Sequence, residues 1–506
     1  MTRAIASAAL RRAPRELAVL TLSAALVAGC DGGGGSARVR IDLDVPEEDA
    51  MGALLGDIDA LEFRVSDGQE FVSGQLQQIA EGLPGELRLP DVPTGDDILF
   101  DLSGLDGDAV LAYGRTCRLL VAAQDQEISA LLYFSRVGRF RAGDPPLEPA
   151  RSSGLMFADD RGRAIVTGGS QDDQVVELFD PRVGSFSPQG EAVPRLGGAI
   201  AVRADGTAVI AGGMDAAGVP VGVVEQFNPG SQAEDERIVQ LGPERQAEAE
   251  RTGLGLAALA DGGVLLTGGR TATGSISDGV ALLAGGDDQI RPVAALTRSR
   301  AGHTTSVGLG GVAYMIGGLS VDQTAGTEVV TGSIELYRPE DTGVRLVSAE
   351  LAVPRFGHTA TVLDDGRILV VGGKTPREGG CAADTAVVDC IDAVQQVELF
   401  DPIVDEVRAI DSTNFGAVYD HTATLLTGGR VLITGGVDAS GNPRADAWLF
   451  DPGLEALVPT RAMSRARARH SATELCDGTV LLVGGDTDDG EAPPSERYSP
   501  ASTRPP

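Results

Sequence analysis

The sequence predicts an all-β fold in which one short unit is repeated along most of the 506-residue chain. Three observations indicate this. The composition includes 68 glycines and 27 prolines but only 4% aromatic residues, which is typical of short strands separated by turns. Seven pairs of adjacent glycines recur from residue 168 onward, at intervals of 44 to 63 residues. Most pairs are followed by a short apolar segment that ends in proline. The first glycines of the pairs are Gly168, Gly212, Gly268, Gly317, Gly372, Gly435 and Gly484.

The clearest copy of the unit lies between residues 355 and 402. Residues 358–363 carry β-branched side chains at alternating positions, which predicts a strand with two different faces. Asp365-Gly366 supplies a tight hairpin turn, and the apolar run 367–371 suits a strand buried on both faces. Residues 397–401 form a third strand, which Pro402 ends because it has no N–H to donate.

The chain has four histidines, and all of them stand just before the first strand of a unit: His303, His358, His421 and His470. A catalytic or metal site needs different residues that converge on one point, whereas residues repeated around an axis are typical of structural contacts. We therefore interpret these histidines as structural, each linking its unit to a neighbour by a hydrogen bond.

The double glycines, the proline-ended strands and the histidine segments together resemble the kelch-repeat, galactose-oxidase-central-domain superfamily of β-propellers. A period near 50 residues is the one associated with kelch propellers. The resemblance implies a seven-bladed kelch-type β-propeller over residues 136–503. The seventh unit reaches Pro500 with too little chain left for an outer strand, and residues 138–141 parallel the outer strand of the first unit. We expect 138–141 to close the last blade, since an open edge would leave backbone groups unpaired.

Residues 37–135 have a different pattern, with short strand-like segments separated by turn clusters, and predict a small β-sandwich. The segment 91–95 and the strand after it resemble immunoglobulin- or transthyretin-like modules. The expected strands cover residues 38–45, 60–65, 71–76, 86–89, 98–102, 109–113, 118–122 and 128–134.

Residues 1–29 predict a signal peptide, with a basic start and an apolar run too short to span a bilayer. Its end, Val27-Ala-Gly-Cys30, resembles the lipobox of bacterial lipoproteins. The resemblance implies cleavage before Cys30 and acylation of that cysteine, with residues 30–36 as a glycine-rich tether. We expect the mature protein to be anchored in the bacterial cell envelope, at the periplasmic face of a membrane or at the cell surface.

The charge of the chain limits its partners. Removal of residues 1–29 leaves 37 basic and 72 acidic residues, a net charge of −35. Nucleic acid is excluded as a partner because phosphate binding needs the opposite sign. Membrane contact is expected only through the lipid anchor. Long-range repulsion discourages association, so a monomer is expected.

The cysteines fit an exported protein, because an even number remains when Cys30 is set aside. Cys381 and Cys390 lie close together in the fifth unit, and their spacing predicts a disulfide. Closing that ten-residue loop would contribute ~2.5–3 kcal/mol in the chain-entropy model. Cys117 and Cys476 either pair across the two domains or are separate buried thiols.

Two classes of function remain. The first is a non-enzymatic binding or interaction scaffold for a protein or glycan, since propellers present loops at both ends of a channel. The alternative is a carbohydrate-active or galactose-oxidase-like enzyme with a site in the channel mouth. Galactose oxidases hold copper with histidines and tyrosines, one of which is linked to a cysteine. Here Asp420 separates Tyr419 from His421, and no cysteine is placed for the link. We expect no catalytic residue, metal or other cofactor.

Lipidation can be tested directly at Cys30. A chain expressed with a fatty-acid analogue should take up the label, and the Cys30→Ala variant should not. Equal labelling of the two would contradict the anchor.

Overall fold

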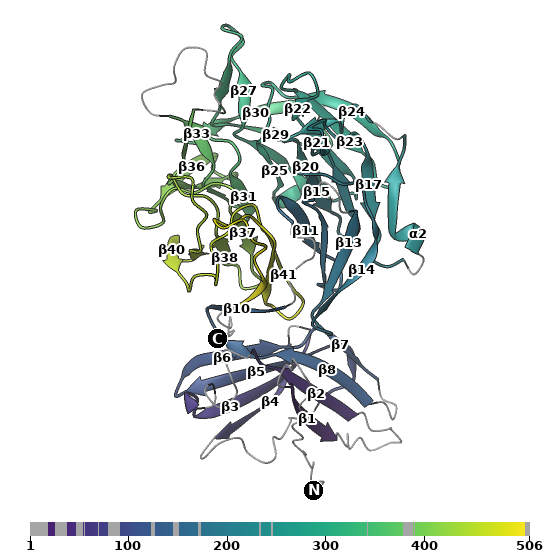
Figure 1. The fold of residues 1–506 in the computed structure, drawn as a ribbon, viewed down its shortest axis with the longest axis vertical. Coiled ribbons are helices and arrows are strands. Elements are labelled where there is room, and N and C mark those ends of the chain that lie inside the picture. Colours follow the sequence, from purple (N-terminus) through teal and green to yellow (C-terminus); the bar gives the residue numbers. More distant parts are fainter. Residues whose placement is uncertain are drawn as a thin grey trace.

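The computed structural model describes residues 19–25, 38–46, 54, 56–68, 70–78, 92–122, 127–144, 151–170, 174–231, 234–243, 246–341, 343–377, 388 and 390–500. This part of the chain is all-β, with many small antiparallel sheets and only short helical turns such as α2 (Glu234–Arg237) and η2 (Leu309–Gly311). None of its helices is long and apolar enough to cross a membrane. Figure 1 shows an N-terminal layered part at one end and a larger ring of sheets above it.

The N-terminal part consists of two sheets that share one hydrophobic core. Ile41 from the first sheet and Phe63 and Phe100 from the second are at most 1% exposed in that core. Seven of the eight expected strands are present, and residues 86–89 lie outside the described residues. The first sheet has the order β1 (Val19–Ala25), β2 (Arg38–Asp44), β8 (Glu127–Tyr133), and the second has the order β4 (Glu70–Gln78), β3 (Ala60–Asp67), β5 (Gly95–Asp106), β6 (Ala109–Arg115), β9 (Ser135–Arg136), with β7 (Leu119–Val121) beside β5.

Strand β1 differs from the sequence-based expectation. Residues 1–29 were expected to take no part in the fold, yet β1 pairs antiparallel with β2 along seven residues of each strand. The apolar run has the length and composition of a strand, and it satisfies the backbone groups at the open edge of β2. Cleavage and acylation at Cys30 stay predictions, because Cys30 and the tether lie outside the described residues.

The rest of the described chain forms seven four-stranded antiparallel sheets, one for each double glycine, which we number as repeat sheets 1 to 7. Their strands, in spatial order, are β11 (Gly154–Ala158), β12 (Ala164–Gly168), β13 (Val175–Asp180), β14 (Ser185–Glu191); β15 (Ala199–Val202), β16 (Ala208–Ala211), β17 (Val224–Phe227), β18 (Ile238–Leu241); β20 (Gly255–Ala258), β21 (Val264–Thr267), β23 (Gly279–Leu283), β24 (Ile290–Ala295); β25 (Thr304–Val307), β26 (Ala313–Ile316), β29 (Ser333–Tyr337), β30 (Val344–Glu350); β31 (Thr359–Val362), β32 (Ile368–Val371), β35 (Val397–Asp401), β36 (Glu406–Ile410); β37 (Thr422–Leu425), β38 (Val431–Thr434), β39 (Ala447–Asp451), β40 (Ala456–Pro459); and β41 (Ser471–Glu474), β42 (Val480–Val483), β43 (Ser495–Ser499), β10 (Arg139–Asp144). Two-stranded extensions are β19 (Arg251–Thr252) with β22 (Arg270–Thr271), β27 (Leu319–Val321) with β28 (Glu328–Val330), and β33 (Lys374–Pro376) with β34 (Ile391–Ala393).

The repeat sheets form a closed ring. The first strand of each sheet lies beside the first strand of the next, and β41 lies beside β11. The second strands are buried on both faces, as the apolar run predicts, and Ile368–Val371 in β32 is fully buried. This arrangement is consistent with a β-propeller. We call the end of the ring that carries the double glycines the glycine end, and the end that carries the turns between first and second and between third and fourth strands the hairpin end.

Strand β10 joins the beginning of the ring to its last sheet. It pairs antiparallel with β43, from Arg139 opposite Ser499 onward, and it extends beyond the expected residues 138–141. Phe140 is buried and packs on Tyr498, with ring centroids 4.8 Å apart. Only Val137 and Gly138 separate β10 from β9, which pairs with β6 of the N-terminal part. The two parts of the molecule are therefore connected by consecutive strands.

The N-terminal part rests on the hairpin end of the ring. A disulfide joins Cys117 to Cys476, which resolves the alternative left open by the sequence. Arg497 is buried, pairs with Asp477, and lies 3.9 Å from the centroid of the Tyr133 ring. In Figure 1 the strand β10 lies between the two parts, and β27 lies at the opposite end of the molecule.

Loss of the Phe140 ring should destabilise the protein through sheet 7. Phe140→Ala should lower the free energy of unfolding by about 3 kcal/mol, the usual cost of removing a buried aromatic ring. Urea denaturation measures this. The control Phe71→Ala removes a phenyl ring that is 58% exposed on β4 and should change stability by less than about 0.5 kcal/mol. Equal effects of the two substitutions would contradict the closure by β10.

Candidate functional site

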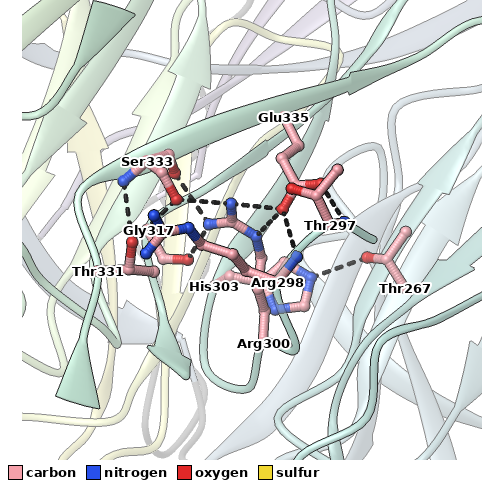
Figure 2. Close-up of polar contacts among 9 residues, drawn as sticks. All are labelled: Thr267, Thr297, Arg298, Arg300, His303, Gly317, Thr331, Ser333 and Glu335. Carbon is pink, nitrogen blue, oxygen red and sulfur yellow. Dashed lines mark hydrogen bonds and ion pairs between the residues drawn. The ribbon is translucent and has the colours of Figure 1, made fainter. Parts of the chain in front are cut away.

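A buried arginine organises the glycine end of each typical repeat sheet, as sheet 4 shows (Figure 2). Arg300 and Glu335 are both fully buried and form an ion pair of 2.7 Å. The guanidinium also donates to the carbonyl of Gly317 at 2.7 Å and to that of Ser333 at 2.8 Å. Glu335 accepts the backbone N–H of Thr297 at 2.7 Å. One ion pair therefore links the third strand to the double glycine and to the segment that precedes the first strand.

The same pair recurs in four other sheets and is absent from two. Each of these arginines lies 17 residues before the glycine whose carbonyl it binds. The additional pairs are Arg151–Glu177, Arg195–Glu225, Arg355–Glu398 and Arg467–Glu496. In sheet 3, Arg251 keeps its bond to the carbonyl of Gly268, but Ala281 stands in the glutamate position. In sheet 6, Val418 and Trp448 replace both partners, so arginine and glutamate are lost together there.

The four predicted histidines lie at equivalent places, each against a threonine of the preceding sheet. The Nε2 atoms lie 2.8–3.1 Å from the hydroxyl oxygens in the pairs His303–Thr267, His358–Thr304, His421–Thr359 and His470–Thr422. Burial, together with a neighbouring guanidinium, lowers the pKa of His303, His421 and His470 to about 3. The rings are therefore neutral at pH 7 and are packed between sheets, where they do not meet one another at a common point.

The double glycines fit between these histidines. A methyl group on Gly317 would lie 2.9 Å from Cε1 of His358 in the next sheet, and one on Gly318 would lie 2.9 Å from Cβ of His303 in its own sheet. Both glycines also have a positive φ, of 63° and 107°. Because a side chain is excluded at both positions, the pair of glycines is needed wherever two histidines flank it.

Each repeat sheet is preceded by a short lead-in segment, which begins at the arginine described above, or at Val418 in sheet 6, and ends at the first strand. One position of this segment differs in residue type between the sheets. The third residue of each segment has φ between 53° and 63° in all seven sheets. These collar positions are Ser153, Gly197, Gly253, Gly302, Gly357, Asp420 and Arg469. In four sheets the N–H of the collar residue donates to the carbonyl of the collar residue before it, at 2.8–2.9 Å. The three residues other than glycine are consecutive around the ring, in sheets 6, 7 and 1. A left-handed conformation costs such a residue about 1 kcal/mol or more, and strain of this kind clusters at functional sites.

Charged and aromatic side chains gather beside this strained part of the collar. Lys374 Nζ lies 3.5 Å from Oδ1 of Asp420 and 4.4 Å from the centroid of the Tyr419 ring. Arg469 NH1 lies 3.3 Å from Oδ2 of Asp420, and Arg469 also pairs with Asp486. We call these five residues the collar cluster. Its charged side chains are 21–44% exposed, so it can bind a ligand at the surface without opening the fold.

The collar cluster contains the kinds of groups that bind polar ligands. Its two cations can bind carboxylate or phosphate oxygens, its two carboxylates can accept hydroxyl or amide hydrogens, and Tyr419 offers an apolar face. His421 does not join Tyr419 there, because its ring is buried against Thr359. Within the described ranges, no three histidine, cysteine, aspartate or glutamate side chains are placed to hold a metal ion.

The remaining predicted residues are only partly described. Cys390 is disulfide-bonded, but Cys381 lies outside the described residues, so a bond between these two stays a prediction. The buried glutamates were missed by the sequence analysis. The sequence does contain a signal for them. A glutamate recurs at a fixed place in the otherwise apolar third strands, such as Glu398 in VELF, and a buried carboxylate needs a cation as its partner.

Comparisons with known proteins support the fold. No family model matches the chain. Over 176 residues it is 24% identical to an F-box/kelch-repeat protein of Arabidopsis thaliana, which covers 29% of this chain and 34% of that protein. Over 69 residues it is 36% identical to tRNA wybutosine-synthesizing protein 4 of Saccharomyces cerevisiae, covering 13% of this chain and 10% of that protein.

A solved structure of YjhT matches with a TM-score of 0.45 and 14% identity, over 60% of this chain and 94% of that chain. The chain spans about a third or less of the length of the curated relatives it matches. The likeness to a kelch-repeat protein, together with the ring of four-stranded sheets, supports a kelch-type β-propeller.

The strain at the collar predicts a gain in stability on substitution by glycine. Ser153 has φ of 55°, so Ser153→Gly should raise the free energy of unfolding by about 0.5–1 kcal/mol, the relief of strain less the extra entropy of the unfolded chain. The neighbouring Ser152→Gly is the control and should lower stability, because Ser152 is not among the residues with positive φ. Urea denaturation of both variants compares them, and a destabilised Ser153→Gly protein would show that the collar is not strained there.

Proposed function

We propose that this chain is a non-enzymatic binding scaffold of the bacterial cell envelope. It would be anchored through acylated Cys30, with a small β-sandwich domain followed by a seven-bladed kelch-type propeller. In this proposal the collar cluster at the glycine end recognises a protein or glycan. The observation that carries the proposal is that two adjacent strained collar residues, Asp420 and Arg469, are themselves partly exposed charges and lie beside Lys374 and the Tyr419 ring.

The position of the N-terminal part supports this choice of face. It contacts the hairpin end through the Cys117–Cys476 disulfide and the contact between Arg497 and the Tyr133 ring, and the glycine end lies on the other side of the ring. A lipid anchor at the start of the N-terminal part would therefore leave the collar cluster directed away from the membrane. Loops at the free end of a rigid scaffold are where binding residues are commonly found.

The only lysine of the chain allows a direct test, because Lys374 belongs to the collar cluster. An amine-reactive photo-crosslinker attached to the purified chain carries a probe at this single side chain, apart from the N-terminal amine. Irradiation in native envelope fragments should give one dominant cross-linked partner, and Lys374→Arg, in which only the N-terminal amine can be labelled, should lose that partner.

Two variants test whether the cross-linked partner binds the collar cluster or only lies near it. Arg469→Ala removes a cation of the collar cluster and should reduce the yield of the cross-linked partner about tenfold, the loss of one charge-assisted hydrogen bond. Arg345→Ala removes a 62% exposed arginine on β30 and should leave the yield unchanged. An unchanged yield with Arg469→Ala would sink the proposal.

A further inference from the structure

A second candidate site lies at the hairpin end, between the N-terminal part and the ring. A cavity of about 610 Å³ opens there. The N-terminal part contributes Leu99, Arg115 and Arg118 to its lining. Repeat sheet 1 contributes two turns, and sheets 6 and 7 contribute their turns between first and second strands. The volume lies in the range of small-molecule sites, which commonly form between domains.

The cavity is basic although the chain is strongly acidic. Four arginines line it, against two aspartates, in a protein of formal net charge −32. Arg115 is paired with Asp101 at 2.7 Å and Arg118 with Asp97 at 3.0 Å. The lining also includes Arg182 of the turn between β13 and β14.

The turn between β11 and β12 supplies the other arginine and both aspartates. The carboxylate of Asp159 forms an ion pair of 2.6 Å with Arg163 and accepts hydrogen bonds from backbone N–H groups of its own turn. Asp160 is exposed to solvent. Among the described residues, the guanidinium groups of Arg161 and Arg182 have no carboxylate within ion-pair distance. These two cations are therefore available to a ligand.

The wall behind the arginines is rigid and partly apolar. Gly162 accepts the backbone N–H of Cys476 at 2.9 Å, and Cys476 is fixed to Cys117 by the disulfide. A methyl group on Gly162 would lie 2.6 Å from Cβ of Cys476, so only glycine allows this close approach. Leu99 and Leu475 complete the lining with apolar side chains. The turn that carries Arg161 is thus fastened to sheet 7 and, through the disulfide, to the N-terminal part.

From this geometry we propose that the cavity is a binding site for a small anionic molecule. Arg161 and Arg182 hold an oxyanion, either carboxylate or phosphate, by charge-assisted hydrogen bonds, for which the planar guanidinium fork is suited. The uncharged part of the ligand lies against Leu99 and Leu475. The acidic surface repels anions at long range, so binding depends on short-range contacts inside the cavity and needs salt to screen that repulsion.

The test uses the full chain with its disulfide intact and two simple probes, pyrophosphate and citrate. Isothermal titration calorimetry at a constant ionic strength of 0.15 M should show saturable binding of at least one probe. Arg161→Gln/Arg182→Gln should weaken that binding at least tenfold, whereas Arg161→Lys/Arg182→Lys should recover part of it. Vesicles that contain phosphatidylglycerol form a third arm, which tells a lipid headgroup from a free anion as the source of the oxyanion.

A control variant that loses the same two positive charges elsewhere shows whether weaker binding comes from the cavity or from the changed net charge of the protein. Arg291→Gln/Arg345→Gln removes two cations that are 69% and 62% exposed on the outer strands of sheets 3 and 4, and it should bind the probes as the wild type does. Thermal melting without ligand should be alike for all variants, and the lysine pair carries the comparison if the glutamine pair does not fold. Affinity in Arg161→Gln/Arg182→Gln within twofold of the wild type, or no saturable binding in any arm, would overturn the proposal.

Discussion

A buried guanidinium needs a carboxylate to balance its charge and acceptors for its N–H groups. This requirement determines how the segments of each typical repeat are held together. Arg300 has lost all contact with water, so the protein supplies a carboxylate and two carbonyls in its place. Leaving one member of such a pair unmatched costs about 3–5 kcal/mol, whereas an apolar pair is tolerated. Repeat sheet 6 follows this logic, since Val418 and Trp448 replace both members at once. The third strand, the double glycine and the lead-in segment keep their relative positions because one side chain binds them all.

Local sequence signals predicted most of the fold. The double glycines, the apolar second strands and residues 138–141 each carry a requirement of backbone conformation, burial or edge pairing that is visible within a few residues. The partners of the buried arginines were missed because Glu335 lies 35 positions after Arg300, and only the folded register brings them together. The collar cluster and the hairpin-end cavity were missed for the same reason. Arg161 and Arg115 meet one cavity only because the disulfide and β10 fix how the two parts pack.

The two ends of the ring differ in what they can bind. At the glycine end, Arg469 and Lys374 are matched by Asp420 and Asp486, so the surface is locally neutral and offers donors, acceptors and an aromatic ring. At the hairpin end, arginines outnumber aspartates in a half-open cavity whose wall is partly apolar. The first surface suits a large partner that covers it, and the second suits a small molecule that enters it. The ring lies between them, so a ligand at one end does not obstruct the other.

The closure of the ring by β10 also fixes when the fold can be completed. The pairing of Arg139 with Ser499 joins the two ends of the ring, and the disulfide beside it spans a sequence separation of 359 residues. Contacts of such long range form late, because the whole intervening loop must be ordered first. Until the last strand has been made, β10 and the hairpin end stay without their partners, and their edges are exposed to other chains. Truncation of the C-terminal strand would therefore affect the first residues of the ring as much as the last.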